Sequence, residues 1–108
     1  MNNSKFISGM VMYTIKNDDL REKVRDGIID RYGKHILNES TYEIKCASES
    51  PSSIVSVLEK ICAAAKKETG KEFIKNDPGN KNDFVTFYRA TNSDDKENRD
   101  RIQLITIV

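Results

Sequence analysis

The stretch MYTIKNDDLREKV, residues 12–24, holds the side chains of this sequence that are best placed to do chemistry. An apolar segment ends there, and the adjacent carboxylates of Asp18 and Asp19 open a segment of mixed charge. Carboxylate oxygens are ligands that Mg²⁺ prefers, so this pair could in principle supply oxygens to a Mg²⁺ or Mn²⁺ ion. Asn17 or Asp18 can also cap the first turn of a helix, where acids oppose the positive end of the helix dipole. We expect helix capping, with no metal and no catalytic residue, and keep a metal site at Asp18 and Asp19 as the alternative.

The other residues of catalytic type are isolated in the sequence. His35 is the only histidine, so a pair of histidines for acid–base catalysis would need a second copy of the chain. Ser40 lies in no nucleophile motif and suits hydrogen bonding in a turn or bulge, and Glu43 suits a solvated strand position. Cys46 and Cys62 are too few for a disulfide framework or a zinc site. We expect both thiols to be reduced and to pack as small apolar side chains.

Basic residues form two sets that could contact phosphates. The first set is Arg21, Arg25, Arg31, Lys34 and His35. Acids interleave with it, so ion pairs along a solvated helix explain it equally well. The second set, less diluted by acids, is Lys60, Lys66, Lys67, Lys71 and Lys75. The residues that we expect to bind nucleic acid are Arg31, Lys34, Lys60, Lys66 and Lys67. Tyr88 and Arg89 could stack on a base or pair with it, although packing explains them more simply.

Composition limits the class of protein. The 108 residues suffice for one domain, residues 1–108, and the net charge of +1 argues against a protein that coats nucleic acid by bulk charge. The apolar run of residues 9–13 is far shorter than the roughly 20 residues that span a bilayer, and no signal peptide is recognisable. We therefore expect a cytoplasmic protein without membrane contact.

Hydrophobic periodicity predicts five strands and two helices. The strands are expected over residues 7–16, 35–37, 40–46, 83–90 and 101–108, with a kink at residues 38–39. The helices are expected over residues 18–32, ended by Gly33, and from Ser50 to Gly70. Gly27 costs about 1 kcal/mol relative to alanine inside a helix, so we expect it to permit close packing on the sheet.

This order of elements predicts an α+β fold of the ferredoxin-like βαββαβ type with an additional C-terminal strand. Right-handed crossovers put both helices on one face of an antiparallel sheet and leave the other face for a partner. The last strand is apolar on both faces, and an exposed apolar edge invites pairing. We expect a homodimer sealed partly by Ile102, Leu104, Ile105 and Ile107.

Three segments carry a resemblance to a known family. They are residues 13–24 (YTIKNDDLREKV), residues 31–43 (RYG, ILN and STYE) and residues 83–88 (DFVTFY). In order and character they resemble the small CRISPR adaptation proteins, which are the dimeric partners of the CRISPR integrase, and their relatives shaped like the virulence-associated protein D ribonucleases. The resemblance implies a ferredoxin-like dimer that contacts RNA or DNA in antiviral defence.

The family's metal-binding aspartate falls at Thr14 in this sequence. A threonine hydroxyl is a neutral, weak ligand for Mg²⁺. The resemblance therefore implies a dimeric nucleic-acid-associated binding or scaffolding protein without nuclease activity. One alternative is a metal-dependent endonuclease or endoribonuclease that uses Asp18 and Asp19. Another is a regulator that binds a protein partner, such as an antitoxin or an inhibitor.

Overall fold

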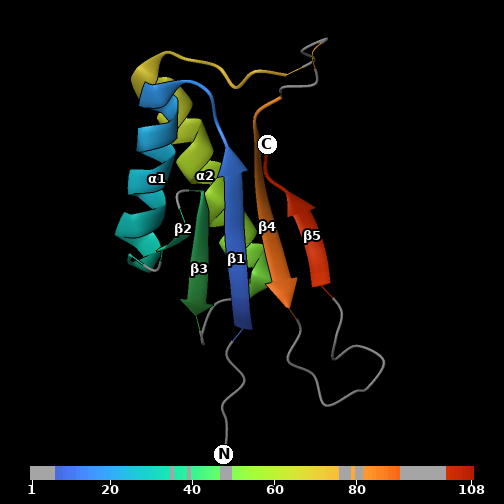
Figure 1. Ribbon diagram of the computed structural model, residues 1–108. Helices are drawn as coiled ribbons and strands as arrows, with labels where there is room; N and C mark the ends of the chain where they lie inside the picture. The colour runs from blue at the N-terminus through green and yellow to red at the C-terminus, as the bar shows by residue number, and fades with distance from the viewer. Residues whose placement is uncertain are drawn as a thin grey trace, which may run out of the picture.

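The computed structural model describes residues 7–34, 36–38, 40–46, 50–75, 79, 82–90 and 102–108. Five strands and two helices follow one another along these residues (Figure 1). They are β1 (Ile7–Thr14), α1 (Asp18–Tyr32), β2 (Ile36–Asn38), β3 (Thr41–Cys46), α2 (Pro51–Thr69), β4 (Phe84–Ala90) and β5 (Ile102–Thr106). Neither of the described helices is long and apolar enough to cross a membrane.

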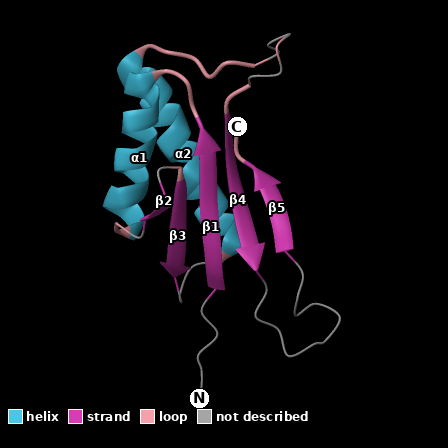
Figure 2. Cartoon of the chain, in the orientation of Figure 1, coloured by secondary structure: helices cyan, strands magenta, loops and turns pink. Residues whose placement is uncertain are grey.

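The strands form one antiparallel sheet in the order β2-β3-β1-β4-β5 (Figure 2). Both helices pack on the same face of this sheet. Strand residues that alternate along β1, β3 and β4, such as Val11, Ile44 and Phe87, join the helices in a single core. The predicted α+β fold is therefore confirmed: the arrangement is compatible with a ferredoxin-like fold plus a C-terminal strand.

The helices begin and end where the sequence places their caps. The Asn17 side chain accepts a hydrogen bond from the Leu20 amide, 3.0 Å away, and the Ser50 hydroxyl accepts one from the Ser53 amide at 3.2 Å. Gly33 and Gly70 follow the last turns at positive φ (89° and 68°), where a glycine avoids the strain of a side chain. The local sequence therefore determines both helices.

The helices contact each other at Gly27. A Cβ atom on Gly27 would lie 2.7 Å from Cγ2 of Ile61 in α2, too close for any side chain. The prediction that Gly27 packs on the sheet is wrong, because the close approach is to the neighbouring helix. Ile61 is half-buried at this contact, and its neighbour Cys62 lies in the core.

The strand ends differ slightly from the predicted ranges. β1 ends at Thr14, two residues early, and β5 ends at Thr106 because the amides of Ile107 and Val108 both donate to the Val85 carbonyl. The predicted kink in the β2–β3 hairpin is present as a shift of register between residues 36 and 38.

The second face of the sheet carries no helix. Its described side chains are Met10, Met12, Thr14, Thr41, Glu43, Phe84, Thr86, Tyr88, Leu104 and Thr106. We call this surface the helix-free face. Glu43 is the one charged side chain among these ten, and Leu104 and Met10 are 61% and 38% exposed. Charged side chains are therefore scarce among these ten, in a chain with 32% charged residues.

Candidate nucleic-acid interface

Asp83 fastens the segment after α2 to the end of β1. Its carboxylate is fully buried and accepts hydrogen bonds from the Lys16 amide (3.0 Å) and the Ile74 amide (2.8 Å). The Asp83 amide donates back to the Ile74 carbonyl at 2.8 Å, and the Lys75 ammonium donates to the Asp83 carbonyl at 2.9 Å. The polar segment 71–75 is therefore held beside the carboxyl end of the first strand, at one end of the molecule (Figure 1).

An open cleft of about 750 Å³ lies at this end, beside α1. We call it the strand-end cleft. Its lining comes from the end of β1, the first two turns of α1 and the β2–β3 hairpin, and consists of Tyr13, Thr14, Ile15, Arg21, Arg25, Ile36, Asn38, Ser40 and Tyr42. These described lining residues include two arginines and no carboxylate. The lining itself therefore offers guanidinium N–H groups, which can donate to an anion, while Asp18, Glu22 and Asp26 pair with the same two arginines outside it.

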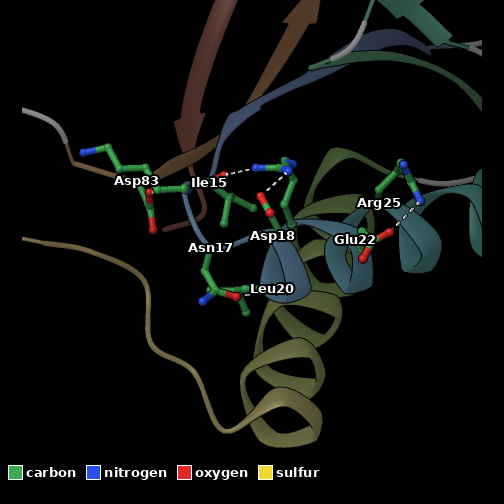
Figure 3. A network of polar contacts seen from close by, with 9 residues as sticks. Ile15, Asn17, Asp18, Leu20, Glu22, Arg25 and Asp83 are labelled. Carbon is green, nitrogen blue, oxygen red and sulfur yellow. Dashed lines mark hydrogen bonds and ion pairs between the residues drawn. The ribbon is translucent and has the colours of Figure 1, made fainter.

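Arg21 is fixed at the mouth of the cleft by two short hydrogen bonds. Its guanidinium donates to the Ile15 carbonyl at 3.0 Å and to the Asp18 carboxylate at 2.6 Å. The Asp18 side chain is largely exposed, so the carboxylate lies on the solvent side and not in the cleft lining. Figure 3 draws these two hydrogen bonds as dashed lines, one to Ile15 and one to Asp18.

Arg25 lies one turn further along α1. Its guanidinium forms exposed ion pairs with Glu22 (3.9 Å) and Asp26 (3.5 Å), of which the first is drawn in Figure 3. Exposed pairs of this kind contribute little to stability. Arg21 and Arg25 are four residues apart, so they share one face of the helix. Both arginines therefore line the cleft from the same side of α1.

Two buried tyrosines meet at the cleft. The Tyr13 hydroxyl donates to the Tyr42 hydroxyl at 3.4 Å, and the ring centroids lie 5.8 Å apart. Burial, followed by the hydrogen bond to Tyr42, raises the pKa of the Tyr13 phenol well above its ordinary value, although Arg25 and Arg21 act in the opposite direction. Tyr13 is therefore neutral at physiological pH and does not repel an anion.

Thr14 and the two acids of the junction are not gathered into a carboxylate cluster. Thr14 lies at the end of β1 on the helix-free face, whereas Asp18 and Asp19 lie in the first turn of α1. Asp18 is held by Arg21, and the helix cap is Asn17. Among the described residues, no group of three or more His, Cys, Asp and Glu side chains could hold a metal ion.

The five residues predicted to bind nucleic acid fall in three places. Lys66 and Lys67 lie in the last turn of α2, close to the start of α1, because Glu68 pairs with Lys23 at 3.7 Å. Lys60 lies in the middle of α2. Arg31 and Lys34 lie at the far end of α1, about 22 Å from its start at 1.5 Å per residue. Lys66 and Lys67 therefore lie at the end of α2 near the start of α1, whereas Lys34 lies two residues before Ile36, which lines the cleft.

Lys71 and Lys75 follow α2 at the same end. Lys75 donates to the Asp83 carbonyl, and Lys66 pairs with Glu72 at 3.0 Å. Lys67 and Lys71 are exposed. Lys66 and Lys75 line a separate pocket with Ile107 and Val108, and Glu72 partly neutralises the charge of this segment.

The residues predicted to seal a dimer divide between the two faces of β5. Leu104 is exposed on the helix-free face, whereas Ile105 and Ile107 pack against the core. The backbone of Ile102 is part of β5, and its side chain lies outside the described residues. A dimer contact made by β5 would therefore centre on Leu104.

The remaining candidate residues either pack or form hydrogen bonds within the fold, or lie outside the described part of the chain. Ser40 donates through its amide (3.0 Å) and its hydroxyl (3.4 Å) to the Asn38 side-chain oxygen, which is the turn role that was predicted. Tyr88 is half-buried on the helix-free face. The position of His35 and the side chain of Arg89 lie outside the described residues.

Both thiols were expected to pack as small apolar groups. Cys62 is buried in the core, and burial, with a smaller contribution from Glu59, raises the pKa of its thiol to about 12. It is therefore an inert core residue. The side chain of Cys46 lies outside the described residues.

Sequence reasoning missed five of the residues that line the cleft: Tyr13, Ile15, Ile36, Asn38 and Tyr42. Alternation along residues 41–46 predicts that Tyr42 lies on the buried face, but nothing local predicts that its hydroxyl meets that of Tyr13. Their pairing depends on the register of β1 against β3, which sets Val11 opposite Tyr42.

Comparison of the chain with protein-family models, with curated proteins and with solved structures finds no match. Only the residues of the cleft therefore indicate what it could bind.

Proposed function

We propose that this protein is a dimeric, nucleic-acid-associated binding or scaffolding module of the CRISPR-adaptation-protein type, acting in the cytoplasm without nuclease activity of its own. The observation that supports it most directly is the strand-end cleft, in which Arg21 and Arg25 face a lining free of described carboxylates. Guanidinium groups bind the phosphates of a nucleic acid backbone in planar, bidentate geometry.

The near-neutral net charge of +1 is compatible with such a role if the contact is local. A backbone that enters the cleft meets two arginines, and beyond them the exposed Lys67 and Lys71 at the same end of the molecule. Contacts of this kind position a nucleic acid without reading its sequence. The fold adds support, because a ferredoxin-like domain leaves one sheet face free for a partner.

The helix-free face supports dimer formation. A second copy would cover Met10, Met12, Phe84, Tyr88 and Leu104 with the same apolar surface, in a closed, two-fold arrangement that leaves no further face to aggregate. Two copies would also place two clefts on one particle, so that a single strand or duplex could contact both.

Binding is tested by fluorescence anisotropy with labelled single-stranded RNA, single-stranded DNA and duplex DNA. We expect affinity to fall steeply between 50 and 200 mM salt, with a slope of about −0.7 to −0.9 per phosphate contacted. Arg25→Gln should lower the slope by about one contact. It should also leave the fold intact, because Arg25 makes only exposed ion pairs.

Two further variants measure how far the contact surface extends. The double change Lys66→Glu, Lys67→Glu should weaken binding, because it reverses charge at the end of α2. Arg31→Gln then tests whether the contact surface continues along α1. If this variant loses as much affinity as Arg25→Gln, the surface reaches Arg31. If its affinity is unchanged, the surface does not reach Arg31. The absence of binding to every probe at low salt would refute the proposal.

The dimer is tested separately by sedimentation at micromolar concentration. We expect twice the monomer mass for the native chain and the monomer mass for Leu104→Glu, which puts a charge on the helix-free face. Ser56→Glu, on the exposed surface of α2, is the matched control and should stay dimeric. A native chain that sediments as a monomer refutes the dimer.

The same preparation decides between this proposal and its alternatives. Cleavage of RNA or DNA that needs Mg²⁺ or Mn²⁺ and disappears in Asp18→Ala, Asp19→Ala would establish a nuclease instead. Co-purification with one protein, insensitive to nuclease treatment, together with no nucleic acid binding, would establish a regulator of the antitoxin or inhibitor kind.

A further inference from the structure

We infer that the strand-end cleft binds a phosphate monoester, namely the terminal phosphate of a nucleic acid strand or the phosphate of a free nucleotide. The inference deepens the proposed function and rests on it, since it names the part of the nucleic acid that enters the cleft.

The first argument is charge. Arg21 and Arg25 lie one helical turn apart and line the same cleft, so two guanidiniums face one anion. A phosphate monoester carries nearly two negative charges at neutral pH, compared with one for an internal phosphodiester. The acids that pair with these arginines (Asp18, Glu22 and Asp26) are exposed and absent from the cleft lining. These acids offset the charge of the two guanidiniums from the solvent side, so the cleft would hold the dianion through the arginine N–H groups that line it and not through net positive charge.

The second argument is the supply of hydrogen-bond donors. The Asn38 side-chain oxygen accepts both hydrogen bonds from Ser40, so the amide nitrogen of Asn38 remains to donate. The Tyr42 hydroxyl accepts the hydrogen bond from Tyr13, so its own proton remains to donate as well. Tyr42 is only 2% exposed, but it is one of the residues that line the cleft. An oxyanion with several acceptor oxygens satisfies these donors.

The third argument is size. The cleft of about 750 Å³ is far larger than a phosphate and within the range of nucleotide-sized ligand sites. Ile15 and Ile36 supply apolar lining beside the arginines, and Ile36 is 41% exposed although apolar. A sugar and base attached to the phosphate would cover this surface. The lining thus joins an anion site to an apolar wall.

The test uses one oligonucleotide sequence with three kinds of end: a 5′-phosphate, a 3′-phosphate and hydroxyl groups only. We expect one phosphorylated form to bind the native chain about tenfold more tightly than the hydroxyl form, a difference that corresponds to about 1.4 kcal/mol. The form preferred identifies the end. Adenosine monophosphate and inorganic phosphate, titrated against ¹⁵N-labelled protein, show whether a free nucleotide suffices.

Three variants assign the effect to the cleft. Arg25→Gln should abolish the preference for the phosphorylated end, and Tyr42→Phe should reduce it, because each removes a donor from the cleft. Arg31→Gln, the matched arginine at the other end of α1, should leave the ratio of affinities unchanged even if it weakens binding overall. Circular dichroism confirms that each variant is folded.

The outcomes separate this inference from the proposed function. Equal affinity for all three ends, with salt-dependent binding retained, overturns the inference and leaves the proposed function standing. Failure to bind any oligonucleotide overturns the proposed function. The titrations with inorganic phosphate and adenosine monophosphate then show by themselves whether the cleft binds a phosphate monoester. Chemical-shift changes at Arg25 and Tyr42 in that case support a site for a small phosphate monoester, and their absence overturns it.

Discussion

Replacing Asp83 by alanine should detach the segment that joins α2 to β4 from the end of β1. The Asp83 carboxylate is fully buried and is the acceptor for two amides, those of Lys16 and Ile74, at 3.0 and 2.8 Å. A hydrogen bond to a charged group contributes about 1.5–3 kcal/mol, and both amides would lose their acceptor at once. We therefore expect a loss of about 3 kcal/mol, which for a domain of this size lowers Tm by roughly 12–24 °C.

The assay is chemical and thermal unfolding of the native chain, Asp83→Ala and Asp83→Asn. The asparagine keeps one carbonyl oxygen as an acceptor, so it should lose about half as much stability as the alanine. Asp30→Asn, at an exposed position in α1, is the control and should stay within about 0.5 kcal/mol of the native chain. A change of that small size for Asp83→Ala would refute the idea that Asp83 fastens the segment. If Lys71 and Lys75 contribute to binding, Asp83→Asn should also weaken nucleic acid affinity.

Two further changes test the core. Gly27→Ala should destabilise the protein by about 1 kcal/mol. The new Cβ atom would lie only 2.7 Å from Cγ2 of the branched Ile61 side chain, and this steric clash outweighs the gain in helix propensity. A double-mutant cycle with Ile61→Ala should show coupling of at least about 0.5 kcal/mol, and additivity would contradict the contact. In a Cys46→Ser background, the Cys62 thiol should resist alkylation until the protein unfolds. Its pKa is raised in the folded state to about 12, so the stability that the neutral thiol provides is complete below about pH 8.5 and falls as the pH rises. Between pH 8.5 and 10, the free energy of unfolding of the chain should fall by about 1–2 kcal/mol more than that of the Cys62→Ala variant, as measured by urea unfolding. An equal fall in both proteins would contradict the raised pKa of Cys62.

Much of the fold could be predicted because its signals are local. Asn17 and Gly33 begin and end α1, Ser50 and Gly70 do the same for α2, and period-two alternation marks the strands. The order of these elements then leaves few topologies, since crossovers are right-handed and short. The predictions that failed concern contacts between elements. Gly27 packs on α2 rather than on the sheet, because the crossing of two helices is a property of the pair.

The site could be predicted only in part. The sequence predicts that Arg21 and Arg25 share one face of a helix. The acidic residues between and beside them are equally typical of an ordinary solvated helix surface. The structure shows that Asp18, Glu22 and Asp26 lie outside the cleft lining, and this separation of charge gives the two arginines a common direction. Arg31, of the same residue type on the same helix, lies at the other end.

The sequence by itself determined the elements of this protein, their caps and the class of fold, because hydrophobic period and capping chemistry act over a few residues. Only the tertiary structure decided which polar groups work together. Asp83 looks like any acid before a strand, yet burial makes it the acceptor for amides 67 and 9 residues away in the chain. Tyr13 and Tyr42 meet across 29 residues for the same reason, since strand register brings them together. Contacts over such distances depend on the whole packed chain, which no local pattern encodes.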